Sequence, residues 1–120
     1  MEIKIANKKY TLYFGWDFLD QINRLFGAKM EVEGQEINTN TGGLAFLEVG
    51  LASYDPIAVQ KAIQAATSTE TTKPALVNIR KAVEDKLVND PKDYKAFVDE
   101  LRDTVKKDKF LQAILTISDK

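Results

Sequence analysis

The side chains best suited to chemistry lie close together near the N-terminus. Asp17 and Asp20 are three residues apart, so on a helix they would share one face. Such a pair could share a proton or bind a cation, and Tyr10 or Tyr13 could act as a phenolic acid. The chain has no His and no Cys, which removes imidazole bases, thiol nucleophiles and metals held by either. We therefore expect both carboxylates to complement a helix dipole, and we predict no catalytic residue, metal or cofactor.

Two other segments contain residue types that are common in phosphate-binding sites, but neither has the sequence motif of such a site. The segment "TNTGG", residues 39–43, lacks the Gly-Lys-Ser/Thr ending of a phosphate-binding loop. The segment "KKDK", residues 106–109, is typical of a solvated helix face. Seventeen basic residues against eighteen acidic ones give a net charge of −1, so the chain has no overall positive field to hold a nucleic acid.

The N-terminal residues show the period of a β-hairpin. Ile3 and Ile5 alternate with charged residues, and a second alternating run begins at Tyr10. Asn7 is suited to a left-handed turn position between the two runs. We predict a hairpin over residues 1–14.

A helix is predicted directly after this hairpin. Apolar residues recur at helical spacing over residues 16–26, Gly15 stands at the N-cap position, and Gly27 stands at the left-handed position that often ends helices. We expect the hairpin to pack on this helix, with Trp16 as a core side chain between them. Trp is also enriched at interfaces, so the alternative is an anchor for a partner.

The rest of the chain is predicted to be mostly helical. Residues 28–43 are either a loop or a small hairpin that turns near Glu33 and Gly34, and residues 44–117 form a helical region. Asp-Pro pairs at Asp55 and Asp90 are typical helix starts. The predicted fold is α+β and mostly α, with the N-terminal hairpin packed on a bundle of about five helices. We expect residues 1–120 to be a single domain.

Composition and hydropathy favour a soluble protein. Hydrophobic residues make up 44% and charged residues 29% of the chain. The most apolar region, residues 44–66, is broken by Glu48, Asp55 and Lys61, which are costly inside a bilayer. The pattern therefore indicates a buried segment of a cytoplasmic protein. We expect no membrane partner.

One stretch carries a resemblance to a known family. "YTLYFGWDFLDQINRLFG", residues 10–27, enters a helix from an aromatic strand through Phe-Gly-Trp-Asp-Phe. It resembles the start of the tail assembly chaperones of long-tailed phages and prophages of Gram-positive bacteria. The link at Gly42-Gly43 and the following "LAFLEVGLASYDP" fit the same resemblance.

The resemblance implies a non-enzymatic assembly factor. Such proteins bind the tape measure protein, keep it soluble, and assist polymerisation of the tail tube. They act in the cytoplasm of the bacterial host and are absent from the mature virion. A frameshifted longer form recruits the tail tube protein in many of these phages, and this chain would be the short form.

A second class of function remains open at this point. A small helical phage DNA-binding regulator or antitoxin would need a basic recognition helix. Residues 78–86 are the best candidate, because they contain Arg80, Lys81 and Lys86, but Glu84 and Asp85 dilute them.

The expected binding surface is apolar and helical. A chaperone for a long amphipathic helix needs an exposed apolar stripe or groove. Two regions have more apolar residues than one core contact requires: residues 44–66 and the C-terminal "FLQAILTI". We predict that one surface, for the client or for self-association, is formed by Leu51, Tyr54, Ile57, Phe110, Leu111, Ile114 and Leu115.

Overall fold

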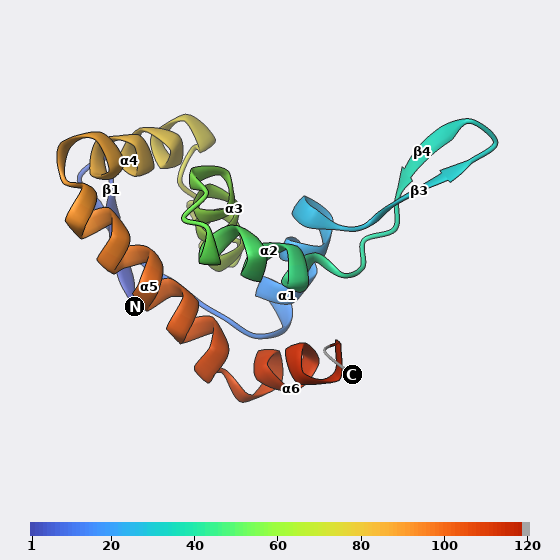
Figure 1. The fold of residues 1–120 in the computed structure, drawn as a ribbon. Coiled ribbons are helices and arrows are strands. Elements are labelled where there is room, and N and C mark those ends of the chain that lie inside the picture. The colour runs from blue at the N-terminus through green and yellow to red at the C-terminus, as the bar shows by residue number, and fades with distance from the viewer. Residues whose placement is uncertain (119–120) are drawn as a thin grey trace.

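Six helices and two separate hairpins make up the described part of the chain (Figure 1). The computed structural model describes residues 1–118. The strands are β1 (Glu2–Ile5), β2 (Lys8–Thr11), β3 (Lys29–Val32) and β4 (Gln35–Asn38). The helices are α1 (Trp16–Phe26), α2 (Gly43–Ala52), α3 (Pro56–Ala66), α4 (Leu76–Asn89), α5 (Pro91–Lys107) and α6 (Lys109–Ser118). The predicted α+β, mostly α class is confirmed.

The N-terminal hairpin turns through two left-handed residues. Ala6 has φ 50° and Asn7 has φ 66°, between the antiparallel strands β1 and β2. Alternation along β1 buries Ile3 and Ile5, and Ile3 is paired with the buried Tyr10. The hairpin thus presents one apolar face to the helices.

This hairpin packs mainly on α4, so the expectation that it packs on the helix from Trp16 was wrong. The connection after β2 explains the difference. The backbone N–H of Tyr13 donates to the carbonyl of Ala66 at 2.9 Å, so the chain crosses the end of α3 before α1 begins. The hairpin and α1 are thereby separated by the core.

The central helix is α3, which packs against α1, α2 and α4. Four of its buried residues are alanines, and small side chains allow neighbouring helices to approach closely. Asp55 caps this helix by accepting from the N–H of Ile57 at 2.9 Å, and Pro56 occupies the first turn. Asp90 caps α5 in the same way through the N–H of Asp93.

Two glycines allow the backbones around α1 to come close together. Gly27 has φ −47°, so it does not end α1 in the left-handed conformation that the sequence suggested. A Cβ there would collide with the carbonyl of Asn23 and the side chain of Asn38. Gly43 likewise starts α2 against the backbone of Ile22. Close approach, rather than a positive φ, is the reason for glycine at both positions.

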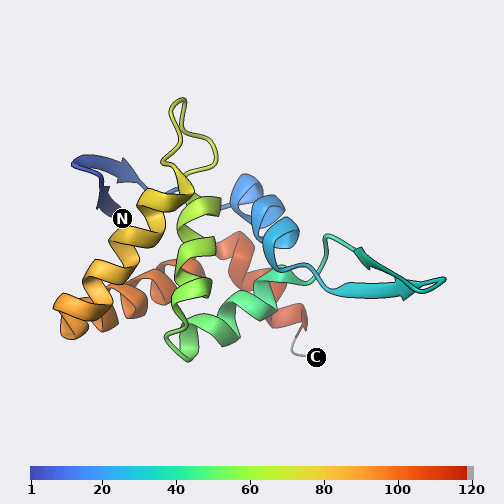
Figure 2. The ribbon, with the colours of Figure 1, turned by 90° about the horizontal axis from the view of Figure 1, so that it is seen from above.

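Residues 28–43 contain the second hairpin, hereafter the arm (β3–β4 and their turn). Glu33 and Gly34 form its turn with φ 53° and 78°, near the predicted position. Every residue of both strands is exposed. The arm projects from the helical body at the end away from α4 (Figure 2).

The burial pattern of α2 gives a direct stability prediction. Leu47 is fully buried, whereas Val49 on the same helix is 69% exposed. We expect Leu47→Ala to lower the free energy of unfolding by about 2–5 kcal/mol, because it leaves a cavity in the core. Val49→Ala is the matched control and should change it by only about 0.5 kcal/mol. Urea denaturation measures both, and equal losses would contradict the packing.

Candidate partner-binding surface

Helix α2 is apolar on both its buried and its exposed side. Leu44, Leu47 and Leu51 face the core. On the opposite side, Phe46 is 51% exposed and Val49 is 69% exposed. Two small exposed residues complete this side, which we call the α2 stripe: Ala45, Phe46, Val49 and Ala52. Their spacing of three and four residues aligns them along one face, which is the pattern that a second helix recognises.

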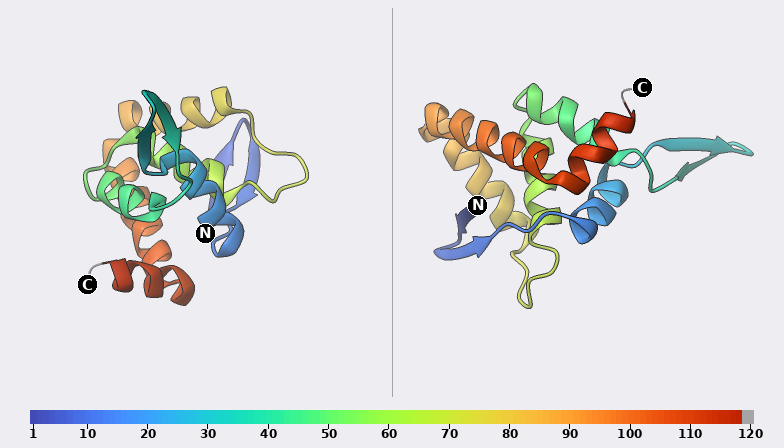
Figure 3. Two further views of the ribbon diagram at one scale, coloured as in Figure 1. Left: turned by 90° about the vertical axis from the view of Figure 1, so that its right-hand side faces the viewer. Right: turned by 90° about the horizontal axis from the view of Figure 1, so that it is seen from below.

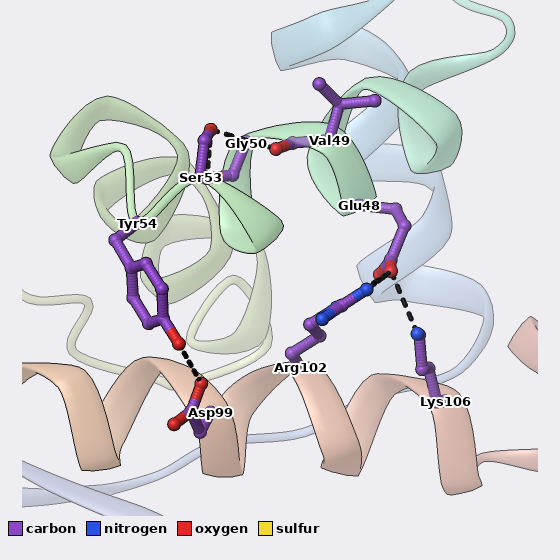
Figure 4. Close-up of polar contacts among 8 residues, drawn as sticks. All are labelled: Glu48, Val49, Gly50, Ser53, Tyr54, Asp99, Arg102 and Lys106. Carbon is purple, nitrogen blue, oxygen red and sulfur yellow. Dashed lines mark hydrogen bonds and ion pairs between the residues drawn. The ribbon is translucent and has the colours of Figure 1, made fainter.

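Polar contacts attach the edge of this stripe to α5 (Figure 4). One oxygen of Glu48 accepts from Arg102 at 2.7 Å and from Lys106 at 3.0 Å. The hydrogen bond with Glu48 raises the pKa of Arg102 above its ordinary value. The other oxygen of Glu48 is buried, with no hydrogen-bond partner among the described residues. These charge-assisted contacts fix the rotation of α2 about its axis.

A second set of contacts holds the turn between α2 and α3. Tyr54 is left-handed at φ 58°, and its hydroxyl donates to Asp99 at 2.6 Å. That bond is the main cause that raises the pKa of Tyr54, and desolvation adds to it. The hydroxyl of Tyr94 donates to the carbonyl of Tyr54 at 2.8 Å, and burial raises the pKa of Tyr94. The α2 stripe is therefore anchored to α5 at its middle and at its end.

The residues predicted for the binding surface are divided between core and surface. Leu51 is 1% exposed and Leu111 is fully buried, so neither is presented to a partner by the folded chain. Their apolar character serves packing, because α6 packs against α5 and α2 (Figure 3). Ile57 is 57% exposed at the start of α3. The other four predicted residues are half-buried: Tyr54, Phe110, Ile114 and Leu115.

Trp16 lies on the surface, so its expected place in the core was wrong. It is 76% exposed, and its ring contacts Phe110 with a centroid distance of 4.5 Å. The core position next to it is taken by Phe18, which is 1% exposed and contacts Phe14. The aromatic contact joins the start of α1 to the start of α6, two segments far apart in the sequence.

Of the four candidate chemical groups, Asp20 and Tyr10 lie apart from the other two. Asp20 pairs with Arg24 at 3.2 Å, and Tyr10 is buried in the hairpin core. Asp17 and Tyr13 are exposed and line an open cavity of about 330 Å³. Among the described residues, no group of three or more acidic side chains is placed to hold a metal ion. No described helix is both long and apolar enough to span a bilayer.

The comparison with protein families gives a match over almost the whole chain. A family model described as phage tail assembly chaperone protein, TAC, matches residues 2–117, which is nearly the whole chain. The chain belongs to this family. No curated protein and no solved structure matches it. The family resemblance noted in the sequence is thus confirmed.

Residues 78–86, the candidate for DNA recognition, lie in α4 and carry mixed charge. Lys86 pairs with Asp93 at 2.8 Å and lies over the ring of Phe97. Arg80 and Lys81 stay exposed on α4, but acidic residues lie one turn further along the same helix. This face of the chaperone has the charges of an ordinary solvated helix.

The contacts of Glu48 predict that its charge stabilises the chaperone. We expect Glu48→Gln to lower the free energy of unfolding by about 1–2 kcal/mol, because two cationic partners lose their carboxylate. Glu36→Gln is the control, since the Glu36–Lys29 pair is well exposed and should contribute under about 1 kcal/mol. Urea denaturation measures the free energy of unfolding of both variants. Equal small effects would mean that Glu48 does not anchor α2.

The raised pKa of Tyr94 predicts a loss of stability at alkaline pH. Folding favours the protonated phenol, so this contribution is complete below the ordinary pKa of 10.0 and is lost as pH rises through the folded value. We expect the unfolding free energy to decline above pH 10, and to decline less in Tyr94→Phe. Tyr13→Phe is the control, because Tyr13 is exposed. If the unfolding free energy of Tyr94→Phe declines with pH as steeply as that of the wild type, Tyr94 is not the cause of the alkaline loss of stability.

Proposed function

We propose that this chaperone binds apolar helical segments of the tape measure protein on the α2 stripe. The observation that carries the proposal is the exposure of Phe46 and Val49 on a helix whose other side is fully packed. An exposed apolar stripe of this kind suits helix-in-groove recognition, in which side chains at positions i, i+3, i+4 and i+7 make the contacts. Family membership supports a role with tail proteins.

The anchoring of α2 favours such binding. A surface already held in its bound orientation loses little conformational entropy when a partner binds. Glu48 and Tyr54 hold α2 and its end against α5, so the stripe is preorganised. Charged side chains at the edge of the stripe, Arg102 and Lys106, supply a polar rim around the apolar contact.

The half-buried members of the surface predicted from the sequence extend the proposed contact. Phe110 lies with the exposed Trp16 at the start of α6, and α6 packs against α2. A client helix that covers the α2 stripe could continue onto this aromatic pair, and Ile114 and Leu115 follow on α6. Aromatic side chains add large contact area at low entropic cost, which suits a client with varied apolar side chains.

We propose, in addition, the wider role that the family resemblance implies. The chaperone keeps the tape measure protein soluble in the cytoplasm of the host and assists polymerisation of the tail tube around it. It acts without catalysis and is left out of the mature virion. Contact with the tail tube protein is made through a frameshifted longer form of the same protein.

Co-expression with the tape measure protein tests the binding surface. We expect the double variant Phe46→Ser/Val49→Ser to stay folded, because both side chains are exposed, and to leave most of the client in the insoluble fraction. The reason is the loss of the apolar contact area that shields the client from aggregation. The soluble client is measured by quantitative immunoblotting, and folding by circular dichroism.

The control is Val88→Ser on α4, where Val88 is as exposed as Val49, at 69%. It should leave the amount of soluble client at the wild-type value. If the folded Phe46→Ser/Val49→Ser chaperone keeps the client soluble as well as the wild type does, the α2 stripe is not the binding surface.

A further inference from the structure

The open cavity at the start of α1 has aromatic walls. Its volume is about 330 Å³, and we call it the aromatic cavity after three of its lining residues, Tyr13, Phe14 and Trp16. Phe14 contacts the buried Phe18 with a centroid distance of 4.9 Å, which connects the cavity to the core. Tyr13 and Trp16 are 52% and 76% exposed, so both rings are open to a ligand.

Backbone contacts hold these aromatic residues in place. The N–H of Tyr13 donates to the carbonyl of Ala66 at the end of α3, and the N–H of Leu19 donates to the carbonyl of Gly15 in the first turn of α1. Gly15 lies between these two contacts with φ 119°, a conformation that other residues rarely adopt. The turn at Gly15 therefore brings the residues on either side of it to one cavity.

The cavity contains one carboxylate, and this carboxylate is unpaired. Asp17 is the single charged residue of the lining, and it forms no ion pair among the described residues. Asp20 on the same helix, by contrast, pairs with Arg24. The faces of aromatic rings carry partial negative charge, and Asp17 adds a full one. The groups that line the cavity therefore attract a cation.

The guanidinium of arginine is the cation that matches these groups best. Its plane stacks on aromatic faces, and its N–H groups donate in pairs to a carboxylate. A hard metal ion needs several oxygen ligands, whereas the lining has a single carboxylate. The volume lies near the lower end of the roughly 300–1,000 Å³ of ligand pockets, so the cavity suits one side chain better than a large ligand.

The arginine that fits this cavity does not come from the chain itself. Each of its three arginines donates to another side chain of the same molecule: Arg24 to Asp20, Arg80 to Gln60 and Arg102 to Glu48. A second copy has the same contacts, so its arginines are engaged as well. The matching guanidinium must therefore belong to a different protein.

We propose that the aromatic cavity binds an arginine side chain of a partner protein, with the guanidinium against the rings of Tyr13 and Trp16 and hydrogen-bonded to Asp17. Trp16 also contacts Phe110, so the cavity borders the surface proposed above for the client. A partner segment in which an arginine lies beside apolar residues reaches both. The cavity is nevertheless a separate site, and its preference for arginine does not depend on the α2 stripe.

Titration with a short peptide tests this preference. Trp16 is the single Trp of the chain, so its fluorescence reports directly on the cavity. The probe is acetyl-Gly-Arg-Gly-amide, and the control peptide has citrulline, which is planar but uncharged, in place of arginine. At constant ionic strength, we expect a saturable change with the arginine peptide and about tenfold weaker binding of the citrulline peptide. Equal binding of the two peptides, or no saturable change with either, would overturn the proposal.

The role of the carboxylate is tested with two variants of α1. Asp17→Asn removes the charge that lines the cavity. Asp20→Asn is the matched control, because Asp20 lies on the same helix but outside the lining. We expect Asp17→Asn to weaken binding of the arginine peptide by about fivefold or more, and Asp20→Asn to leave it unchanged. Equal effects would indicate a general attraction of charges and would contradict a site at Asp17.

The role of the rings is tested at Tyr13, since its variants keep the fluorescent Trp16. We expect Tyr13→Leu to weaken binding by about threefold or more, and Tyr13→Phe to bind as the wild type does, because it keeps an aromatic face. Circular dichroism measures the folding of each variant, and the exposure of Tyr13 predicts that both stay folded. Equal binding by the two variants would contradict the aromatic contact. These titrations use the isolated chaperone, so their outcome is independent of whether the tape measure protein is its client.

Discussion

The close packing of α3 is the constraint on which the rest of the structure depends. Helices α1, α2 and α4 all pack against it, and this requires small residues along its length. Its one buried polar side chain, Gln60, is satisfied by Gln64 and Arg80, so the core contains no uncompensated amide there. With α3 at the centre, α1 and α2 are displaced to one end and α4 to the other. The positions of the α2 stripe and the arm follow from this arrangement.

Local signals in the sequence predicted the helix starts and turns well, because the interactions involved span only a few residues. The caps at Asp55 and Asp90 each depend on one side chain and the N–H groups just after it. The turn at Glu33 and Gly34 depends on two residues that tolerate positive φ. These elements require no knowledge of the tertiary fold.

Features that depend on long-range contacts were not predictable in the same way. Both Trp16 and Phe18 are aromatic residues at the start of one helix, and only the packing of α1 decides that Phe18 is buried and Trp16 exposed. Leu51 and Val49 are two residues apart on a helix that is apolar nearly all round, so the sequence could not decide which would face a partner. The exposed apolar side chains of the arm, Met30, Val32 and Ile37, were not predicted because they lie on two four-residue strands, which are too short for a strong periodic signal.

A chaperone must expose apolar surface and yet avoid aggregating with itself without limit. This structure separates its exposed apolar residues into small groups, each beside charged side chains: the α2 stripe beside Glu48 and Arg102, and the arm beside Glu31 and Glu36. Small groups of this kind bind weakly when alone, whereas a long client can engage several of them at once. Binding strength then grows with the length of the client.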